Sequence, residues 1–214
     1  MSASFPVVLS APSGGGKTTV ARALLRRRAD LGYSVSCTTR KPREGEEDGT
    51  DYYFLTKEEF ERRRSIGEFA EYAEVHGKMY GTLRSEVTRV LESGRHVLMD
   101  IDVQGASRFA TAFPETVLVF LLPPSVDVMV QRLKGRGTEG RDALLTRLRT
   151  ARAELSAVGR YHYVVVNDDL ERTIDRVASI IDAEMVAHDR VRMLDKQVGD
   201  LLDQLQQEID AVQV

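Results

Sequence analysis

Glycines, a lysine and two threonines near the start of the chain have the types and spacing of a phosphate site. Gly14, Gly15 and Gly16 directly precede Lys17 and Thr18. Residues without side chains let backbone N–H groups converge on an oxyanion, and the start of a following helix adds its positive dipole end. Lys17 can reach the β- and γ-phosphates of a nucleotide, and the Thr18 hydroxyl can face Mg²⁺. The stretch therefore predicts a nucleotide-binding loop formed by Ala11, Pro12, Ser13, Gly14, Gly15, Gly16, Lys17, Thr18 and Thr19.

The loop follows the pattern G-x-x-x-x-G-K-[ST] with one departure, because Ala11 stands where the pattern has its first glycine. Alanine can follow that turn only with a negative φ. The alternative is an ordinary glycine turn between a strand and a helix. The apolar run before the loop, the helix-forming sequence after it and the position of Lys17 favour phosphate binding.

A second group of chemically capable residues lies between positions 34 and 94. Arginine presents a fork of donors that fits phosphate, and tyrosine hydroxyls add neutral donors. Glu71 could accept both N1–H and the 2-amino group of guanine, whereas adenine offers no such pair of donors. Taken singly, each of these residues has a surface position as its alternative. Their order in one segment beside the phosphate loop favours a shared site of Ser36, Arg40, Arg43, Tyr52, Glu71, Tyr80 and Thr82.

Strands that alternate with helices must position these residues. The run 117–122 is apolar without alternation, which is typical of a strand covered on both faces. The order of strands and helices predicts an α/β doubly wound parallel core, with the mixed stretch 34–94 inserted between the first helix and the third core strand. Local patterns also predict a first helix over 18–30, ended by Gly32, and then a strand over 69–75, a turn over 77–81 and a helix over 82–93. Further along, they predict a helix over 126–133 and an arginine-rich helix from about Arg141. The last predicted elements are a buried strand over 163–167 and an almost continuous helix over 170–214.

Composition limits the classes of protein. The 214 residues suit one α/β domain with insertions, and 30 basic against 33 acidic residues give a net charge of −3 that calls for neither nucleic acid nor a membrane surface. Cys37 is the only cysteine, and the four histidines lack ligand spacing, so neither an internal disulfide nor a zinc site is expected. We expect a cytoplasmic chain without a secretion signal or membrane helix.

In the segment that holds this second group of residues, the chain resembles guanylate kinase of the bacterial type. Its motif S-V-S-x-T-T-R-x-P-R-x-G-E-x-x-G-x-D-Y-x-F is matched by residues 34–46, Gly49, Asp51, Tyr52 and Phe54. The resemblance covers roughly residues 5–190. Further matching segments are 68–71, 80–82, 100–105, 123–125, 135–139 and 165–169.

This resemblance implies an enzyme of purine nucleotide metabolism that phosphorylates GMP, and dGMP, with ATP and Mg²⁺. It places Ser36, Glu71 and Thr82 at the guanine base and Arg40, Arg43, Tyr52 and Tyr80 at its phosphate. It implies catalytic roles for Lys17 and for the lid arginines Arg132, Arg136 and Arg147. The corresponding division is a phosphate-loop core (1–33, 96–126 and 163–190), a GMP-binding subdomain (34–95), a helical lid (127–162) and a helical tail (191–214).

Asp100 and Asp102 match an acidic pair at the end of a core strand in this family. Strand alternation predicts both on one face, with Asp100 toward Lys17 and the metal and Asp102 toward the nucleotide. The alternative is a pair of helix-capping or turn carboxylates.

Two other functions remain open at this point. Guanylate-kinase-like domains exist that only bind protein partners, but these typically lose the loop lysine or the lid arginines. A related kinase acting on a phosphorylated sugar would have no use for Glu71 together with Ser36 and Thr82.

The tail carries apolar residues at 3-4 spacing, from Val191 to Val212, over about three heptads. This stripe could form a subunit contact, and the alternatives are packing on its own core or a partly frayed helix. Gly199 and the aspartates at 195, 200, 203 and 210 disfavour a parallel zipper, so an antiparallel or trans-docked homo-oligomer is the form that we expect if the tail associates.

Overall fold

The computed structural model describes residues 3–75, 77–134, 141–191 and 193–212 of the chain. The chain divides into two compact units, Ser4–Ser179 and a smaller unit of Met1–Ala3 with Ile180–Val214, and each is described by itself. All of the predicted site residues belong to the larger unit.

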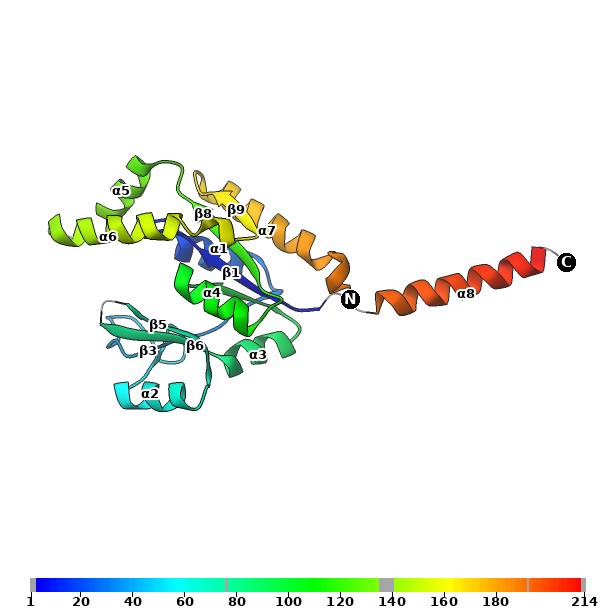
Figure 1. Cartoon of the computed structure of the whole chain (residues 1–214), viewed down its shortest axis with the longest axis horizontal. Coiled ribbons are helices and arrows are strands. Elements are labelled where there is room, and N and C mark those ends of the chain that lie inside the picture. The colour runs from blue at the N-terminus through cyan, green and yellow to red at the C-terminus, as the bar shows by residue number, and fades with distance from the viewer. Residues whose placement is uncertain (1–2, 76, 135–140, 192, 213–214) are drawn as a thin grey trace. The chain divides into compact units, whose positions relative to one another are not determined.

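A five-stranded parallel sheet forms the centre of the larger unit (Figure 1). Its strands are β1 (Pro6–Ser10), β2 (Leu31–Tyr33), β7 (His96–Asp100), β8 (Val117–Leu122) and β9 (Tyr163–Val166), in the order β2-β7-β1-β8-β9. Every neighbouring pair is parallel. The predicted parallel α/β core is thus confirmed.

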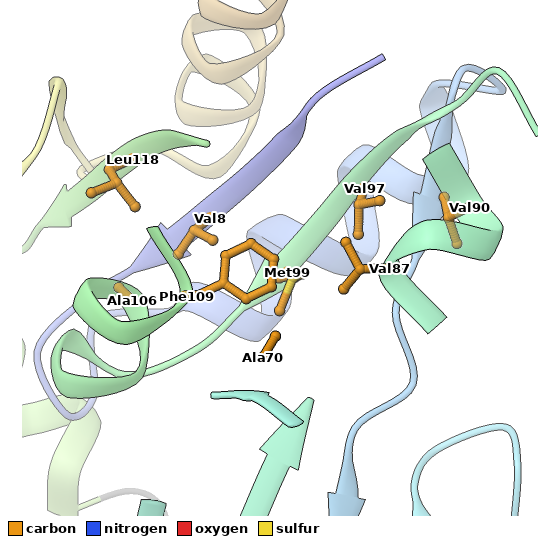
Figure 2. Packing of buried hydrophobic residues seen from close by; sticks show 9 residues of the cluster. All are labelled: Val8, Ala70, Val87, Val90, Val97, Met99, Ala106, Phe109 and Leu118. Carbon is orange, nitrogen blue, oxygen red and sulfur yellow. The ribbon is translucent and has the colours of Figure 1, made fainter. Parts of the chain in front are cut away.

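Helices cover both faces of this sheet. On one face, Phe109 of α4 (Val103–Ala112) and Val87 of α3 (Arg84–Glu92) pack against Val8, Met99 and neighbouring strand residues (Figure 2). Because successive strand residues point to opposite faces, Val7 and Leu9 point to the other face, where α1 (Lys17–Arg27) contacts β1, β2 and β7. The carboxyl ends of β1 and β7 lie side by side, with Leu9 paired to Asp100.

The inserted segment folds as a second, smaller sheet. Its strands are β3 (Cys37–Thr38), β4 (Tyr53–Phe54), β5 (Phe69–Val75) and β6 (Lys78–Leu83), in the order β4-β3-β6-β5. The helix α2 (Lys57–Ser65) begins after Thr56, whose hydroxyl accepts from the Glu59 N–H at 3.1 Å. Its single buried residue, Phe60, stacks on Phe69 at 4.4 Å between ring centroids, which fixes the helix on the sheet.

The turn predicted over 77–81 is wrong, because all but the first of these residues belong to β6 and pair with β5. Only Gly77, with a φ of 71°, has a turn conformation. Gly81 is a glycine for a different reason, since a Cβ there would lie 2.9 Å from the Phe69 ring. The helix expected from residue 82 begins at Arg84.

The end of the first helix was also mispredicted. The helix α1 ends at Arg27, and Gly32 lies inside β2. A Cβ at Gly32 would lie 2.3 Å from Val90 of α3. This glycine therefore allows close helix–sheet packing and does not end a helix.

The segment after β8 is helical. It contains α5 (Val126–Lys134), α6 (Arg141–Leu155) and the 3-10 helix η1 (Val158–Arg160), and α5 packs on α6 through Met129, Leu133 and Ala151. The prediction of a buried last strand is wrong in part. Among the described strands β9 pairs only with β8, and as an edge strand it leaves Val164 49% and Val166 37% exposed.

The prediction of an almost continuous C-terminal helix is wrong. The chain forms α7 (Leu170–Met185), a 3-10 helix η2 (His188–Arg190) and α8 (Leu194–Val212). Extended backbone at Ala187 interrupts the helix, and Arg190 donates from Nε to Glu184 at 2.9 Å. Met193 adopts a φ of 60°, a conformation that a helix cannot contain. Within the parts of the chain that the structure describes, no helix has the length and apolar character needed to cross a membrane.

Candidate active site

The phosphate loop connects the carboxyl end of β1 to the first turn of α1. Gly14 and Gly16 have φ of 82° and 84°, and Gly16 is the N-cap of α1. Across the described residues, Met193 is the only residue other than glycine with a positive φ. Ala11 therefore has the negative φ that its place in the loop requires.

Close contacts explain the remaining glycine. A Cβ at Gly15 would lie 2.6 Å from the Cβ of Ala11, and the Gly15 N–H donates to the Pro12 carbonyl at 2.7 Å. The loop thus closes on itself so tightly that its shape is fixed by the backbone.

Asn167, which follows β9, is hydrogen-bonded to the backbone of the loop. Its Nδ2 donates to the Gly15 carbonyl at 2.6 Å, and its Oδ1 accepts from the Thr173 hydroxyl at 3.2 Å. Asn167 is buried, and a Cβ at Gly16 would lie 2.7 Å from its Nδ2. Reasoning from the sequence gave Asn167 no role, although a polar residue directly after a core strand was an available signal.

The predicted lid arginines have different outcomes. Arg132 lies beside the loop, where its Nη2 donates to the Asn167 carbonyl at 3.3 Å. Its Nη1 is buried and has no hydrogen-bond partner among the described residues. Arg147 lines the cavity in front of the loop. Arg136 lies outside the described residues.

Asp100 connects three elements at the edge of the core sheet. The Thr18 hydroxyl donates to its Oδ2 at 2.7 Å, and the Tyr33 hydroxyl at the end of β2 donates to its Oδ1 at 3.1 Å. Burial, and then the charge of Asp100, raise the pKa of the Tyr33 phenol far above its usual value, so it remains a donor. Tyr33 was not among the sequence candidates, because no motif marked it.

Asp102 does not share a strand face with Asp100. Strand β7 ends at Asp100, and Asp102 is the N-cap of α4, with Oδ1 accepting from the Gly105 N–H at 2.7 Å. The alternation rule fails because the strand has ended, and the capping alternative holds for Asp102. Asp102 still lines the cavity.

The oxygen atoms around Thr18 could act as ligands of a hard cation. Its hydroxyl is exposed and adjacent to the Asp100 carboxylate, and oxygen ligands of these types are those that Mg²⁺ prefers. Among the described residues, no cluster of three or more His, Cys, Asp or Glu could hold a metal by itself. A Mg²⁺ ion at Thr18 would therefore need further oxygens from nucleotide phosphates and water.

A cavity of about 610 Å³ lies in front of the loop. Besides loop residues 11–18 it is lined by Ala73, Glu74 and Val75 of β5, by residues 102–104 at the start of α4, and by one side of α6. One continuous cavity thus connects the phosphate loop with the inserted sheet and the segment predicted as the lid.

Glu71 and Thr82 face each other across the hairpin of β5 and β6. The Thr82 hydroxyl donates to Glu71 Oε1 at 2.8 Å, and both side chains are buried. Burial raises the pKa of Glu71 to about 7, an effect that the Thr82 hydrogen bond opposes and the charge of Asp102 increases. Gly105 makes room for this carboxylate, because a Cβ there would lie 2.9 Å from Glu71 Oε2.

A basic and aromatic cluster forms the other predicted part of the site. Arg40 lies over the Tyr52 ring at 5.3 Å from its centroid, and Tyr52 meets Tyr80 edge to face at 6.1 Å. Arg40 also makes two hydrogen bonds to Glu46, at 2.9 and 3.0 Å, which lower the pKa of that carboxyl. Glu46 was not among the candidate site residues, although it lies in the motif-matching segment 34–46.

Arg43 and Ser36 lie next to this cluster in the chain. The Arg43 N–H donates to Glu46 at 2.8 Å, and the Ser36 carbonyl accepts from the Tyr53 N–H at 2.9 Å. The structure therefore brings together Arg40, Tyr52 and Tyr80 as one group and Glu71 with Thr82 as another. Both groups belong to the inserted segment, with Arg40 and Tyr52 beside its strands.

A parallel α/β core, a closed glycine loop ahead of Lys17, and a carboxylate that accepts from Thr18 define the class of protein, which is a phosphate-loop nucleotide-binding protein. Comparisons with known proteins specify the family. Residues 3–184 match the family model described as guanylate kinase.

Curated relatives and solved structures agree with this match. The chain is 42% identical over 201 residues to a guanylate kinase of Clostridium perfringens, covering 93% of each protein. It is 45% identical over 184 residues to one of Oceanobacillus iheyensis, covering 86% of this chain and 89% of that protein. The crystal structure of guanylate kinase from Anaplasma phagocytophilum has a TM-score of 0.75 and 38% identity, covering 92% of this chain and 94% of that one. The chain belongs to the guanylate kinase family.

Proposed function

We propose that this chain transfers the γ-phosphoryl group of ATP to GMP or dGMP, giving ADP and GDP or dGDP. The observation that carries the proposal is the buried Glu71 carboxylate, held by Thr82 on the inserted sheet whose strand β5 lines the cavity of the phosphate loop. Its two oxygens suit the adjacent N1–H and 2-amino donors of guanine. Ser36 and Thr82 would complete the contacts with the base.

The remaining candidate residues of the inserted segment suit the acceptor phosphate. Arg40, Arg43, Tyr52 and Tyr80 supply donors to its oxygens. Glu46 holds the Arg40 fork over the Tyr52 ring, so the guanidinium is oriented before substrate arrives. Asp100 and Asp102 would lie between this phosphate and the donor.

The chemistry needs no general base. A nucleoside monophosphate has a second pKa near ~6, so its attacking oxygen is already ionised at neutral pH. The chain must instead align donor and acceptor, neutralise charge on the transferring group and exclude water. Lys17 and the loop N–H groups would bind the β- and γ-phosphates, and Arg132, Arg136 and Arg147 would neutralise charge that develops in the transition state.

Thr18 and Asp100 would hold Mg²⁺, which would supply positive charge beside the phosphates of the donor. The close approach of Thr18 to Asp100 supports this assignment. The fixed Tyr33 hydroxyl keeps the Asp100 carboxylate oriented toward Thr18.

The two rival functions lack comparable support. A module that only binds protein partners does not need Lys17 at the end of a closed phosphate loop. A sugar-phosphate kinase does not need a buried carboxylate of raised pKa paired with a hydroxyl.

A coupled assay of ADP release separates these functions. We expect turnover with GMP and dGMP, and little with AMP or with sugar phosphates, each tested at equal concentration with Mg²⁺. Equal turnover with AMP would exclude the proposed base site. Absence of turnover with every acceptor, in protein shown by calorimetry to bind GMP, would favour a binding module.

A further inference from the structure

An acidic side chain from α6 contacts the phosphate loop directly. The Ser13 N–H donates to Glu154 Oε2 at 2.8 Å. Ser13 lies in the middle of the loop, Glu154 lies at the end of α6, and both residues line the cavity. The mechanism described above assigns no role to this contact.

Glu154 lies beside two groups that favour a negative charge. The pKa of its carboxyl is raised above its usual value, chiefly by burial and also by the charge of Asp102, and the Ser13 N–H and the Lys17 ammonium group oppose this rise. Glu154 therefore lies where one backbone donor and the loop lysine both favour a negative group. These are the same features by which the loop attracts phosphate.

A carboxylate and a triphosphate compete for such a position. Both accept hydrogen bonds from the same N–H, and two anions a few ångströms apart repel each other strongly in a partly buried cavity. The triphosphate brings more charge and more acceptor oxygens than one carboxylate. Binding of the donor therefore favours withdrawal of Glu154 from Ser13.

We propose that Glu154 is the chain's own anion at the phosphate loop, that the triphosphate of ATP displaces it, and that it thereby sets the affinity for the donor. The inference rests on the proposed function, because it takes ATP as the ligand of the loop. Arg147 precedes Glu154 by seven residues, about two helical turns, and lines the same cavity. Displacement of Glu154 thus links donor binding to the position of the helix that carries Arg147.

The test is calorimetric titration of ATP into Glu154→Gln, without GMP. Glutamine keeps the length of the side chain and an acceptor oxygen for Ser13, but it removes the charge. We expect the dissociation constant for ATP to fall roughly threefold to tenfold. Glu74→Gln is the matched control, because Glu74 is exposed and lines the same cavity. This substitution removes the same charge. It should change the dissociation constant by less than about twofold.

Three outcomes would overturn the inference. Equal tightening by both variants would mean that only the overall charge of the cavity matters. Unchanged or weaker binding by Glu154→Gln would mean that the contact persists with ATP bound and anchors the loop. Failure of the wild-type protein to bind ATP would overturn the proposed function together with it. Thermal melting of each variant checks folding, and Glu154→Ala repeats the titration should the glutamine variant fold poorly.

Discussion

The two ends of the candidate site are built by different means. The phosphate end, at the edge of the core sheet, is shaped by the backbone, where Gly14 and Gly16 adopt positive φ and Gly15 fits closely against Ala11. The base end, in the inserted sheet, is shaped by side chains, where Thr82 holds Glu71 across a hairpin. The phosphate end thus suits any nucleotide, and selection of the base depends on a few buried side-chain atoms.

Loss of Lys17 should have the largest effect. Lys17→Ala should fold normally, because the side chain is only partly buried, and should lose kcat by orders of magnitude, because it acts on charge that develops in the transition state. Arg136→Ala should likewise fold normally and lose kcat by orders of magnitude. Steady-state kinetics and thermal melting check both variants, with the exposed Lys57→Ala as control. A variant that melts well below wild type yet keeps its specific activity would show a structural role instead.

The base end should respond to pH through the buried carboxyl of Glu71. Burial raises the pKa of Glu71 to about 7, so between its ordinary value near 4.5 and 7 the folded chain binds more protons there than the unfolded chain. The stability contribution of Glu71 is therefore greatest at low pH and falls as pH rises through this window, by roughly 3 kcal/mol.

Denaturant unfolding of the unliganded protein from pH 4.5 to 8 measures this effect. The difference in stability between wild type and Glu71→Gln should change across the window, because glutamine does not titrate. GMP should bind less tightly below pH 7, since guanine needs the ionised carboxylate. A constant difference would mean that folding does not raise the pKa of Glu71.

A methyl group added at Gly105 should weaken the binding of GMP without lowering the stability of the fold. In Gly105→Ala the new Cβ would lie 2.9 Å from Glu71 Oε2, while alanine gains about 1 kcal/mol of helix propensity over glycine in α4. We expect the KM for GMP to rise about tenfold by displacement of the carboxylate, on the scale of lost hydrogen bonds to a charged group, with the KM for ATP unchanged. Gly159→Ala, where a Cβ meets nothing within 4 Å, is the control. An unchanged KM for GMP would show that Glu71 has room to move.

The sequence predicted the phosphate end better than the base end, because the first is shaped by a local motif and the second by contacts between strands. The loop around Lys17 is local, so a sequence motif could predict it, and the order of strands and helices predicted the parallel core. The Glu71–Thr82 contact depends on the register of two strands, and no sequence pattern predicted it, although both residues were candidates for the base site. Residue-by-residue reasoning failed where a glycine had a packing role, as at Gly32 and Gly81, because a turn and a close contact look alike in sequence. Asn167 and Glu154 reach the loop from more than 130 residues away, and local patterns carry no record of such contacts.

The tail should have the smallest effect on catalysis. Most of the apolar residues of α8 are exposed, with Leu201 and Leu205 each at 58%. A chain that ends at Asp189 should keep its kcat, and sedimentation velocity should show whether the full chain forms a larger oligomer than the truncated one. Equal oligomeric states would exclude the tail as a subunit contact.

The central claim is that one buried carboxylate, Glu71, recognises the two adjacent donors of guanine. Its most direct test compares kcat/KM for GMP and for inosine monophosphate, which lacks the 2-amino group, in wild type and in Glu71→Gln. We expect wild type to prefer GMP strongly. Glutamine presents one donor where guanine needs two acceptors, so the variant should lose most of this preference and up to ~10⁴-fold in kcat/KM for GMP at the extreme, with the KM for ATP little changed. Glu74→Gln, on the same strand, should retain the preference. Unaltered GMP turnover in Glu71→Gln, with the preference for GMP intact, would contradict the claim.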